Sequence, residues 1–391
     1  MMKKVFFILL AFVSISFADK KESIALSNFL RLGHDDNIYQ RENDIVETIY
    51  ISDIINLSSK ILFSSRAELL LYWQPEIRYR FDAQEKELFF QDLYASYQNV
   101  LSKSSQITII DRYRYSEIDA NQSGNDSSAY AENNLTASYL RQISERNGFN
   151  LSVGSTSRRT DNDISIYNRT LDFDRYLLSG LITRNLDAAK RSISMGYQYT
   201  DHAVKNSGGG IKSGTLFLGY DRIFNPEFIG SIQLGYTDAE VEQKIGNADL
   251  SLFSDSSHPF FEVGFNYQIS PRTRLSSSYS HSLRYSTSSA FNAEQRSDWL
   301  IALNRDITAK INLAVSYSYV RAFYEVDYLR DTTFAFGSED KSQILNVRAE
   351  YKIDKNHYLE MGYQGRSRDS EVSYNGSYDR NRVYFGWKLE L

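Results

Sequence analysis

Charged side chains occupy alternate positions in several stretches of the chain, which is the spacing that gathers them on one face of an extended strand. Arg78 and Arg80 show this spacing near the beginning, and Arg348, Glu350 and Lys352 show it near the end. Such a face can form cross-strand ion pairs that stiffen a wall, or it can line a path for ions and polar or saccharide solutes. The candidate residues are Arg66, Glu68, Arg78, Arg80, Arg348, Glu350, Lys352, Glu360, Arg366, Arg368, Arg380, Arg382, Lys388 and Glu390.

Histidine chemistry has little support in this sequence. His34, His202, His258, His281 and His357 are scattered, and none of them has the spacing of zinc ligands. His281 lies beside Ser276 to Ser280 and Ser282, so it is the one candidate for a serine hydrolase pair. Its parity groups it with Tyr279 and Leu283 on an apolar face, which favours an ordinary surface position. We therefore expect no enzyme and no cofactor.

Two acidic sequences resemble fragments of a calcium loop. They are Asp36-Asn37 and Asp161-Asn162-Asp163, and both lack the full ligand pattern of a twelve-residue calcium loop. We expect no metal site at either of them.

Apolar and polar residues alternate with a period of two, which indicates the elements that carry the charged faces. Residues 61–81, 261–269, 311–319, 345–353 and 383–391 each place apolar residues on one parity and polar residues on the other. A helix would need apolar residues at i, i+3 and i+4, which these segments do not show. Each segment is therefore predicted to be a β-strand, with 61–81 continuing across Pro75.

Short polar turns alternate along the chain with connections that are mostly longer. The turns are expected near 58–60, 102–104, 145–148, 186–190, 224–227, 270–273, 305–309 and 353–356. The other connections are expected at 35–46, 82–87, 119–129, 159–169, 204–210, 241–257, 287–293, 326–340 and 369–375. These eight turns and nine loops join 18 strands whose first and last ends lie on the same side.

This organisation predicts an all-β fold, a transmembrane antiparallel β-barrel of about 18 strands, with 16 as the alternative count. A soluble β-sandwich or β-helix also contains many alternating strands. Aromatic residues near the strand ends favour the barrel because they match its interfacial girdles. The charged faces favour it too, because a water-filled lumen solvates them, and the residues named above would then line that lumen.

The first eighteen residues have the features of a secretory signal peptide. Lys3 and Lys4 precede an apolar stretch from Val5 to Val13, and small residues stand before a cleavage site near Ala18. Residues 19–391 are then predicted to form one outer-membrane barrel domain.

The chain has 44 basic and 49 acidic side chains, and loss of Lys3 and Lys4 leaves a net charge of −7, which gives no reason to expect nucleic acid as a partner. Cysteine is absent, so disulfides do not hold the protein together.

A glycine flanked by an apolar residue and an aromatic residue recurs in the predicted strands. Parity places each such glycine in the lumen, where the absence of a side chain lets a strand coil tightly and neighbouring aromatics can cover the backbone. The glycines are Gly196, Gly219, Gly235, Gly264, Gly362 and Gly386. We interpret them as wall positions rather than as a ligand site.

Asp111 breaks the apolar parity of 107–115. A carboxylate that faces lipid is unfavourable, so the sequence predicts a bulge or a rim position for this residue.

Two stretches resemble a known family. They are Arg31-Leu32-Gly33-His34-Asp35-Asp36-Asn37-Ile38 and Tyr378-Asp379-Arg380-Asn381-Arg382-Val383. With the signal peptide and the continuous strands, the chain resembles the β-barrel porin 2 family of Gram-negative outer-membrane proteins, some of which resemble barrels of exopolysaccharide export systems. His34 and the terminal Leu391 depart from the aromatic residues common at these places.

The sequence therefore predicts a Gram-negative outer-membrane channel for polar solutes or an accessory to polysaccharide export. A structural or docking barrel with a plugged lumen, whose loops bind surface polysaccharide or a periplasmic partner, is the alternative, and an outer-membrane hydrolase is the third. The expected partners are outer-membrane lipid, the barrel-assembly machinery and polysaccharide. The closing strand 383–391 resembles the signal that this machinery recognises.

Overall fold

The computed structural model describes residues 22–83, 86–117, 129–160, 172–187, 190–205, 209–244, 251–285, 293–324, 339–371 and 376–391. The predicted signal peptide 1–18, residues 326–338 of the predicted loop 326–340, and Asp161-Asn162-Asp163 lie outside these residues. No helix in the described ranges is long and apolar enough to cross a membrane. The described strands are β1 (Glu22–Asp35), β2 (Thr48–Ser64), β3 (Ala67–Arg80), β4 (Glu87–Ser102), β5 (Ser105–Glu117), β6 (Ala129–Gln142), β7 (Asn147–Thr160), β8 (Phe173–Asp187), β9 (Arg191–Val204), β10 (Gly210–Asn225), β11 (Phe228–Lys244), β12 (Ser251–Ser270), β13 (Thr273–Tyr285), β14 (Ala293–Asp306), β15 (Ile311–Tyr324), β16 (Glu339–Lys352), β17 (His357–Ser370) and β18 (Tyr378–Glu390).

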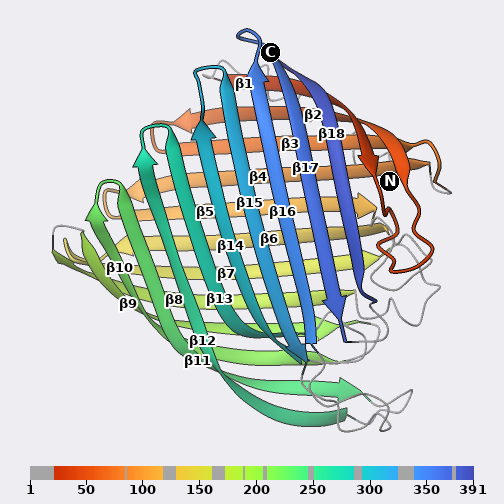
Figure 1. Ribbon diagram of the computed structural model, residues 1–391. Coiled ribbons are helices and arrows are strands. Elements are labelled where there is room, and N and C mark those ends of the chain that lie inside the picture. The colour runs from red at the N-terminus through yellow and green to blue at the C-terminus, as the bar shows by residue number, and fades with distance from the viewer. Residues whose placement is uncertain are drawn as a thin grey trace.

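These strands form one closed antiparallel β-barrel. Each strand pairs with its neighbour in sequence, and β1 pairs with β18 to complete an 18-stranded sheet. Short turns gather at one rim, as Figure 1 shows. Closure satisfies the backbone hydrogen bonds that an open sheet would leave at its edges. The predicted fold class and the count of 18 strands are confirmed.

Two predicted connections were wrong. The turn expected at 58–60 lies at 65–66, so 61–81 is not one strand but the end of β2, a turn and β3. The pair Ser64↔Ala67 closes this hairpin, and a register shift between Leu62 and Ser64 cancels the change of parity that a two-residue turn causes. Odd-numbered residues therefore face outward on both strands, and the alternation runs through the turn unbroken. The loop expected at 241–257 is much shorter, because the ladder of β11 and β12 continues to the pair Lys244↔Ser251.

The outward face of the barrel is apolar and the inward face is polar. On β18, Val383, Phe385 and Trp387 face outward and are exposed. Arg380 has the opposite parity on the same strand and is only 5% exposed. The same alternation exposes large apolar side chains around the barrel, such as Leu218. A surface of this kind suits a hydrocarbon environment, in which a β-barrel satisfies its backbone polar groups internally.

One seam of the barrel is only partly paired. β12 pairs with β11 up to Lys244↔Ser251, but it pairs with β13 only from Ser270↔Thr273 to Phe261↔His281. Beyond that point a buried apolar cluster joins strands from both sides of the seam. Its members are Ile211, Ala239, Val241, Leu283 and Ala293, with Tyr285 packed against it. Side-chain packing therefore closes the wall where the backbone ladder ends.

The recurring glycines pair with inward residues of the neighbouring strands. A Cβ atom on Gly196 would meet the ring of Phe217, and one on Gly362 would meet the ring of Tyr384. Both rings belong to the inward residue on the neighbouring strand, since the pairs are Gly196↔Phe217 and Gly362↔Tyr384. The glycines therefore provide space for aromatic rings that lie along the wall.

Gly235→Ala is expected to destabilise the barrel by about 1–3 kcal/mol, the usual effect of overpacking. Its Cβ would meet the Leu216 carbonyl oxygen, a backbone atom that cannot turn away. Gly180→Ala is the matched control, because nothing lies within 4 Å of a Cβ at that position. Urea unfolding in detergent micelles measures both variants, and equal stability of the two would contradict this account of the wall.

Candidate functional site: the charged lumen

The structure places the charged residues singled out in the sequence on the inward parity of their strands, with one exception. Arg66 lies in the exposed turn between β2 and β3, so its prediction as a lumen residue was wrong. The turn displaces it because β2 extends further than the periodicity indicated. The inward residues are Glu68, Arg78, Arg80, Arg348, Glu350, Lys352, Glu360, Arg366, Arg368, Arg380, Arg382, Lys388 and Glu390.

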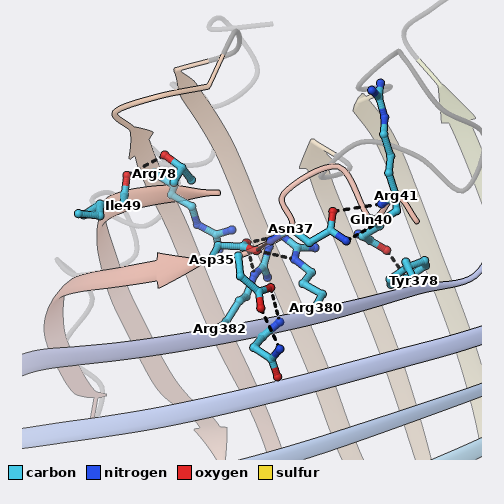
Figure 2. A network of polar contacts seen from close by, with 12 residues as sticks. Asp35, Asn37, Gln40, Arg41, Ile49, Arg78, Tyr378, Arg380 and Arg382 are labelled. Atoms are coloured by element: carbon cyan, nitrogen blue, oxygen red, sulfur yellow. Dashed lines mark hydrogen bonds and ion pairs between the residues drawn. The ribbon is translucent and has the colours of Figure 1, made fainter. Parts of the chain in front are cut away.

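Asp35 is the centre of a buried ion-pair cluster at the seam between β1 and β18 (Figure 2). Its carboxylate accepts hydrogen bonds from Arg380 Nε at 2.9 Å and Arg380 Nη2 at 2.5 Å. Arg382 Nε donates a third hydrogen bond at 2.6 Å. The side chain of Asp35 is 3% exposed and that of Arg380 is 5% exposed, so the pair is shielded from solvent.

The first connection of the chain packs against the same seam. The Asn37 side-chain amide donates hydrogen bonds to the backbone oxygens of Arg41 and Asp379, both at 2.8 Å. The Tyr378 hydroxyl donates to Gln40 Oε1 at 2.7 Å (Figure 2). The two stretches that carried the family resemblance, one near each end of the chain, therefore contact each other. Together they join the first strand to the last.

Arg31 is the centre of a second group of contacts on the inward face, four residues before Asp35 on β1. Its guanidinium lies 4.2 Å from the ring centroid of Phe29 and 4.6 Å from that of Tyr384. Its Nη2 is 3.8 Å from Glu360 Oε1, and the Tyr384 hydroxyl donates to the same oxygen at 2.7 Å. The aromatic rings hold the guanidinium flat through cation–π contacts.

Asp340 repeats the arrangement of Asp35 on another part of the wall. It accepts hydrogen bonds from the Tyr324 hydroxyl at 2.7 Å and from Arg368 Nη2 at 2.5 Å. The side chains of Arg368 and Asp340 are 9% and 7% exposed. Both clusters bind a buried carboxylate to arginines of the barrel wall, which is the arrangement that makes a buried charge tolerable.

A cavity of about 520 Å³ lies along the inward side of β1 to β3 and β13 to β18. Arginines and tyrosines border it on the β18 and β1 to β3 side, and serine, asparagine and glutamine side chains border it on the other side together with Arg274 and Arg348. The polar lining residues are Arg31, Tyr50, Arg78, Arg274, Ser276, Asn304, Ser316, Asn346, Arg348, Tyr363, Gln364, Arg382 and Tyr384. This volume is in the usual range of small-molecule sites, which is about 300–1,000 Å³.

His281 pairs with a serine other than those near it in sequence. Its Nδ1 lies 2.9 Å from Ser297 Oγ on β14. No hydrogen bond or ion pair connects His281 to a carboxylate in the described ranges, so the third member of a catalytic triad has no counterpart there.

In the part of the chain that the structure describes, no three His, Cys, Asp or Glu side chains lie close enough together to hold a metal ion. At the Asp36-Asn37 sequence, Asp36 instead accepts hydrogen bonds from the backbone and side chain of Asn381, at 2.6 and 2.8 Å. Protein donors therefore occupy the oxygens that a cation would need.

The prediction of a bulge or a rim position for Asp111 was wrong. β5 pairs in continuous register around it, and its cross-strand neighbours on the outward face are Ala95 and Leu135. Asn133 Nδ2 donates a hydrogen bond to Asp111 Oδ1 at 2.7 Å. Asn28 and Asp53 form a second outward pair at 2.5 Å. In both pairs an amide supplies the hydrogen bond that lipid cannot.

Sequence reasoning did not assign Asp35, Asp340 or Arg31 to the lumen. Arg31 and Asp35 share the parity of Gly33, so the period of two could have grouped them. No signal in the sequence could have paired Asp35 with Arg380, because their contact depends on closure between strands 345 positions apart.

Comparison with protein-family models and with curated protein sequences finds no match for this chain. The β-barrel porin 2 family thus stays a prediction from the two short stretches.

Solved structures do resemble the barrel. Pseudomonas aeruginosa OccK2 (OpdF), in complex with glucuronate, has a TM-score of 0.50 at 10% identity, over 95% of this chain and 98% of that chain. Pseudomonas aeruginosa OccK9 (OpdG) has a TM-score of 0.49 at 10% identity, over 95% and 99%. The ferric-catecholate import receptor Fiu of E. coli K12, in its closed form, has a TM-score of 0.47 at 8% identity, over 94% and 82%. At these identities the likeness is one of fold, and this chain has the fold of an outer-membrane β-barrel.

Proposed function

We propose that this protein is an outer-membrane channel through which polar solutes cross along the lumen. The observation that carries the proposal is the opposite polarity of the two faces of one closed sheet. Leu218 and Phe385 are exposed on the outward face, whereas charged side chains and a cavity of about 520 Å³ occupy the inward face. A wall that is apolar outside and charged inside is the arrangement of a barrel that holds water in a membrane.

The setting of this channel is the outer membrane of a Gram-negative bacterium. The predicted signal peptide with cleavage near Ala18 accounts for export. The apolar outward face accounts for partition into lipid, and the closing strand, with Val383, Phe385 and Trp387 outward, is the segment offered to the barrel-assembly machinery. We expect Leu391→Phe to leave assembly unimpaired, because an aromatic residue is common at that place in the proposed family.

Reconstitution into planar lipid bilayers tests the channel. The purified protein is expected to produce discrete conductance steps in potassium chloride, because ions can follow a hydrated lumen. The heat-denatured protein at the same concentration is the control for leakage caused by detergent. If the folded protein produces no steps over a series of independent insertions, the proposal of an open channel is wrong.

A docking barrel with a blocked lumen is the second candidate. The observation that favours it is the first connection, in which Asn37 and Ile38 are buried against the inner side of the β1–β18 seam. Polysaccharide or a periplasmic partner would then bind the outer loops. A barrel that binds isolated surface polysaccharide and conducts no ions would support this candidate. The association with polysaccharide export is tested by measuring polymer secretion in a deletion strain.

A further inference from the structure

The cavity in the lumen has an unbalanced lining. Arg31, Arg78, Arg274, Arg348 and Arg382 border it, and no aspartate or glutamate is among the described residues that line it. Ion pairs that only stiffen the wall would present both signs of charge to the lumen. An excess of guanidinium groups instead creates a positive potential in a confined space, which favours an anion.

The carboxylates that balance two of these arginines lie behind them. The side chain of Glu360 is 4% exposed where its partner Arg31 is 26% exposed. The side chain of Asp35 is 3% exposed where Arg382 is 18% exposed. In both pairs the acid is buried in the wall and the guanidinium borders the cavity. The negative charge therefore holds the arginine in place, and the arginine retains an exposed edge that can donate hydrogen bonds.

Arg348 has the most available guanidinium of the group. It is exposed, and no ion pair or hydrogen bond connects its side chain to another residue in the described ranges. On the adjacent strand its cross-strand neighbour is Gly362, where the ring of Tyr384 takes the place of a side chain. A free guanidinium fork at this position can bind a carboxylate or phosphate through two parallel hydrogen bonds.

A row of polar, uncharged side chains lies beside Arg348 on the same wall of the cavity. Gln364 Nε2 donates to Asn346 Oδ1 at 2.9 Å, and Asn346 Nδ2 donates to Ser316 Oγ at 3.3 Å. These residues lie on β15, β16 and β17 and form a hydrogen-bonded row across three strands. Amide and hydroxyl groups in such a row are suited to the hydroxyls of a polyhydroxylated molecule.

We propose that this cavity is a binding site for small polyhydroxylated oxyanions, with the carboxylate or phosphate at the arginines and the hydroxyls at the row of Gln364, Asn346 and Ser316. The site rests on the proposed function, because it names the class of solute that the channel selects. A weak site in the path concentrates its solute and still releases it, which is the requirement for selective conduction.

Calorimetry on the folded protein in detergent tests the site without requiring conduction. The probes are gluconate, glucose 6-phosphate and sorbitol, which differ in the anionic group. Gluconate or glucose 6-phosphate is expected to bind and sorbitol is not, and the comparison of the two acids shows whether carboxylate or phosphate is preferred. Equal heats for gluconate, glucose 6-phosphate and sorbitol would overturn the proposal.

Arg348→Gln is the decisive variant, because it removes a charge without leaving a buried partner. It is expected to weaken gluconate binding about tenfold, the loss of one charge-assisted hydrogen bond. Arg66→Gln removes the same charge from an exposed turn outside the cavity and is expected to bind as the unmodified protein does. If the two variants bind gluconate equally, the arginine-lined site is refuted.

Bilayer recordings separate a failure of the site from a failure of the channel. In a potassium chloride gradient the reversal potential is expected to show preference for chloride, and Arg348→Gln is expected to reduce that preference. Conductance without anion preference and without gluconate binding would refute the site and leave the channel standing. Gluconate binding without conductance would support the site and refute the open channel.

Discussion

Asp35→Asn is expected to reduce the free energy of unfolding by about 3–5 kcal/mol, the usual cost of removing one partner from a buried ion pair. The asparagine keeps the shape of the side chain but cannot balance the charges of Arg380 and Arg382, which both donate to the Asp35 carboxylate. The loss falls at the seam between β1 and β18, where the barrel closes. Urea titration in detergent micelles, followed by tryptophan fluorescence, measures the change.

Glu68→Gln is the matched control for this prediction. Glu68 forms an ion pair with Lys60 at 2.8 Å, but the two side chains are 39% and 48% exposed. Solvent screens such a pair, so its removal is expected to change stability by no more than about 1 kcal/mol. Similar losses for Asp35→Asn and Glu68→Gln would show that the buried cluster does not hold the seam.

Leu218→Arg is expected to destabilise the folded barrel by about 2–4 kcal/mol, the cost of a lipid-facing arginine near the middle of the bilayer. Leu218 lies on the outward face of β10 and is 62% exposed, so an arginine there would have lipid rather than water as its surroundings. Equilibrium folding into phospholipid vesicles measures the effect directly. The loss of stability should be smaller in detergent, because the apolar layer that detergent forms around the barrel is thinner and more adaptable than a bilayer.

Gln233→Arg places the same side chain on the other face of the wall. Gln233 pairs with Gly219 on one side and with Glu262 on the other, and all three take the inward parity. A guanidinium at this position would lie in the lumen beside a carboxylate and should change stability by less than about 1 kcal/mol. If Gln233→Arg is as damaging as Leu218→Arg, the assignment of inside and outside is wrong.

The period of two allowed the fold to be predicted because a half-buried strand alternates whatever its neighbours are. It placed Glu360 and Arg382 on the correct face without any knowledge of strand pairing. It failed at Arg66 because the register shift between Leu62 and Ser64 cancels the change of parity that a two-residue hairpin causes, so the turn leaves no trace in the alternation. It also failed beyond Val241, where backbone pairing alone extends β11 and β12.

The candidate site was less predictable than the fold. Arg78, Arg348 and Arg382 were predicted from the sequence, whereas Arg31 and Arg274 were not. The burial of Asp35 and Glu360 behind two of the arginines depends on closure of the barrel. The outward aspartate Asp111 was misplaced because its stabilising partner, Asn133, lies on a neighbouring strand. Local patterns determine which face a residue takes, whereas the partners on that face depend on register, which periodicity does not reveal.

The central claim is that the inward face of this barrel borders an ion-conducting lumen. Adjacent residues on β16 test it, because Asn346 lines the cavity and Leu345 is outward and 38% exposed. The chain has no cysteine of its own, so Asn346→Cys and Leu345→Cys are each uniquely reactive. In single-channel recordings, a charged, membrane-impermeant thiol reagent is expected to change the conductance of Asn346→Cys in one irreversible step and to leave Leu345→Cys unchanged. No response at Asn346→Cys, or the same response at both positions, would contradict the account.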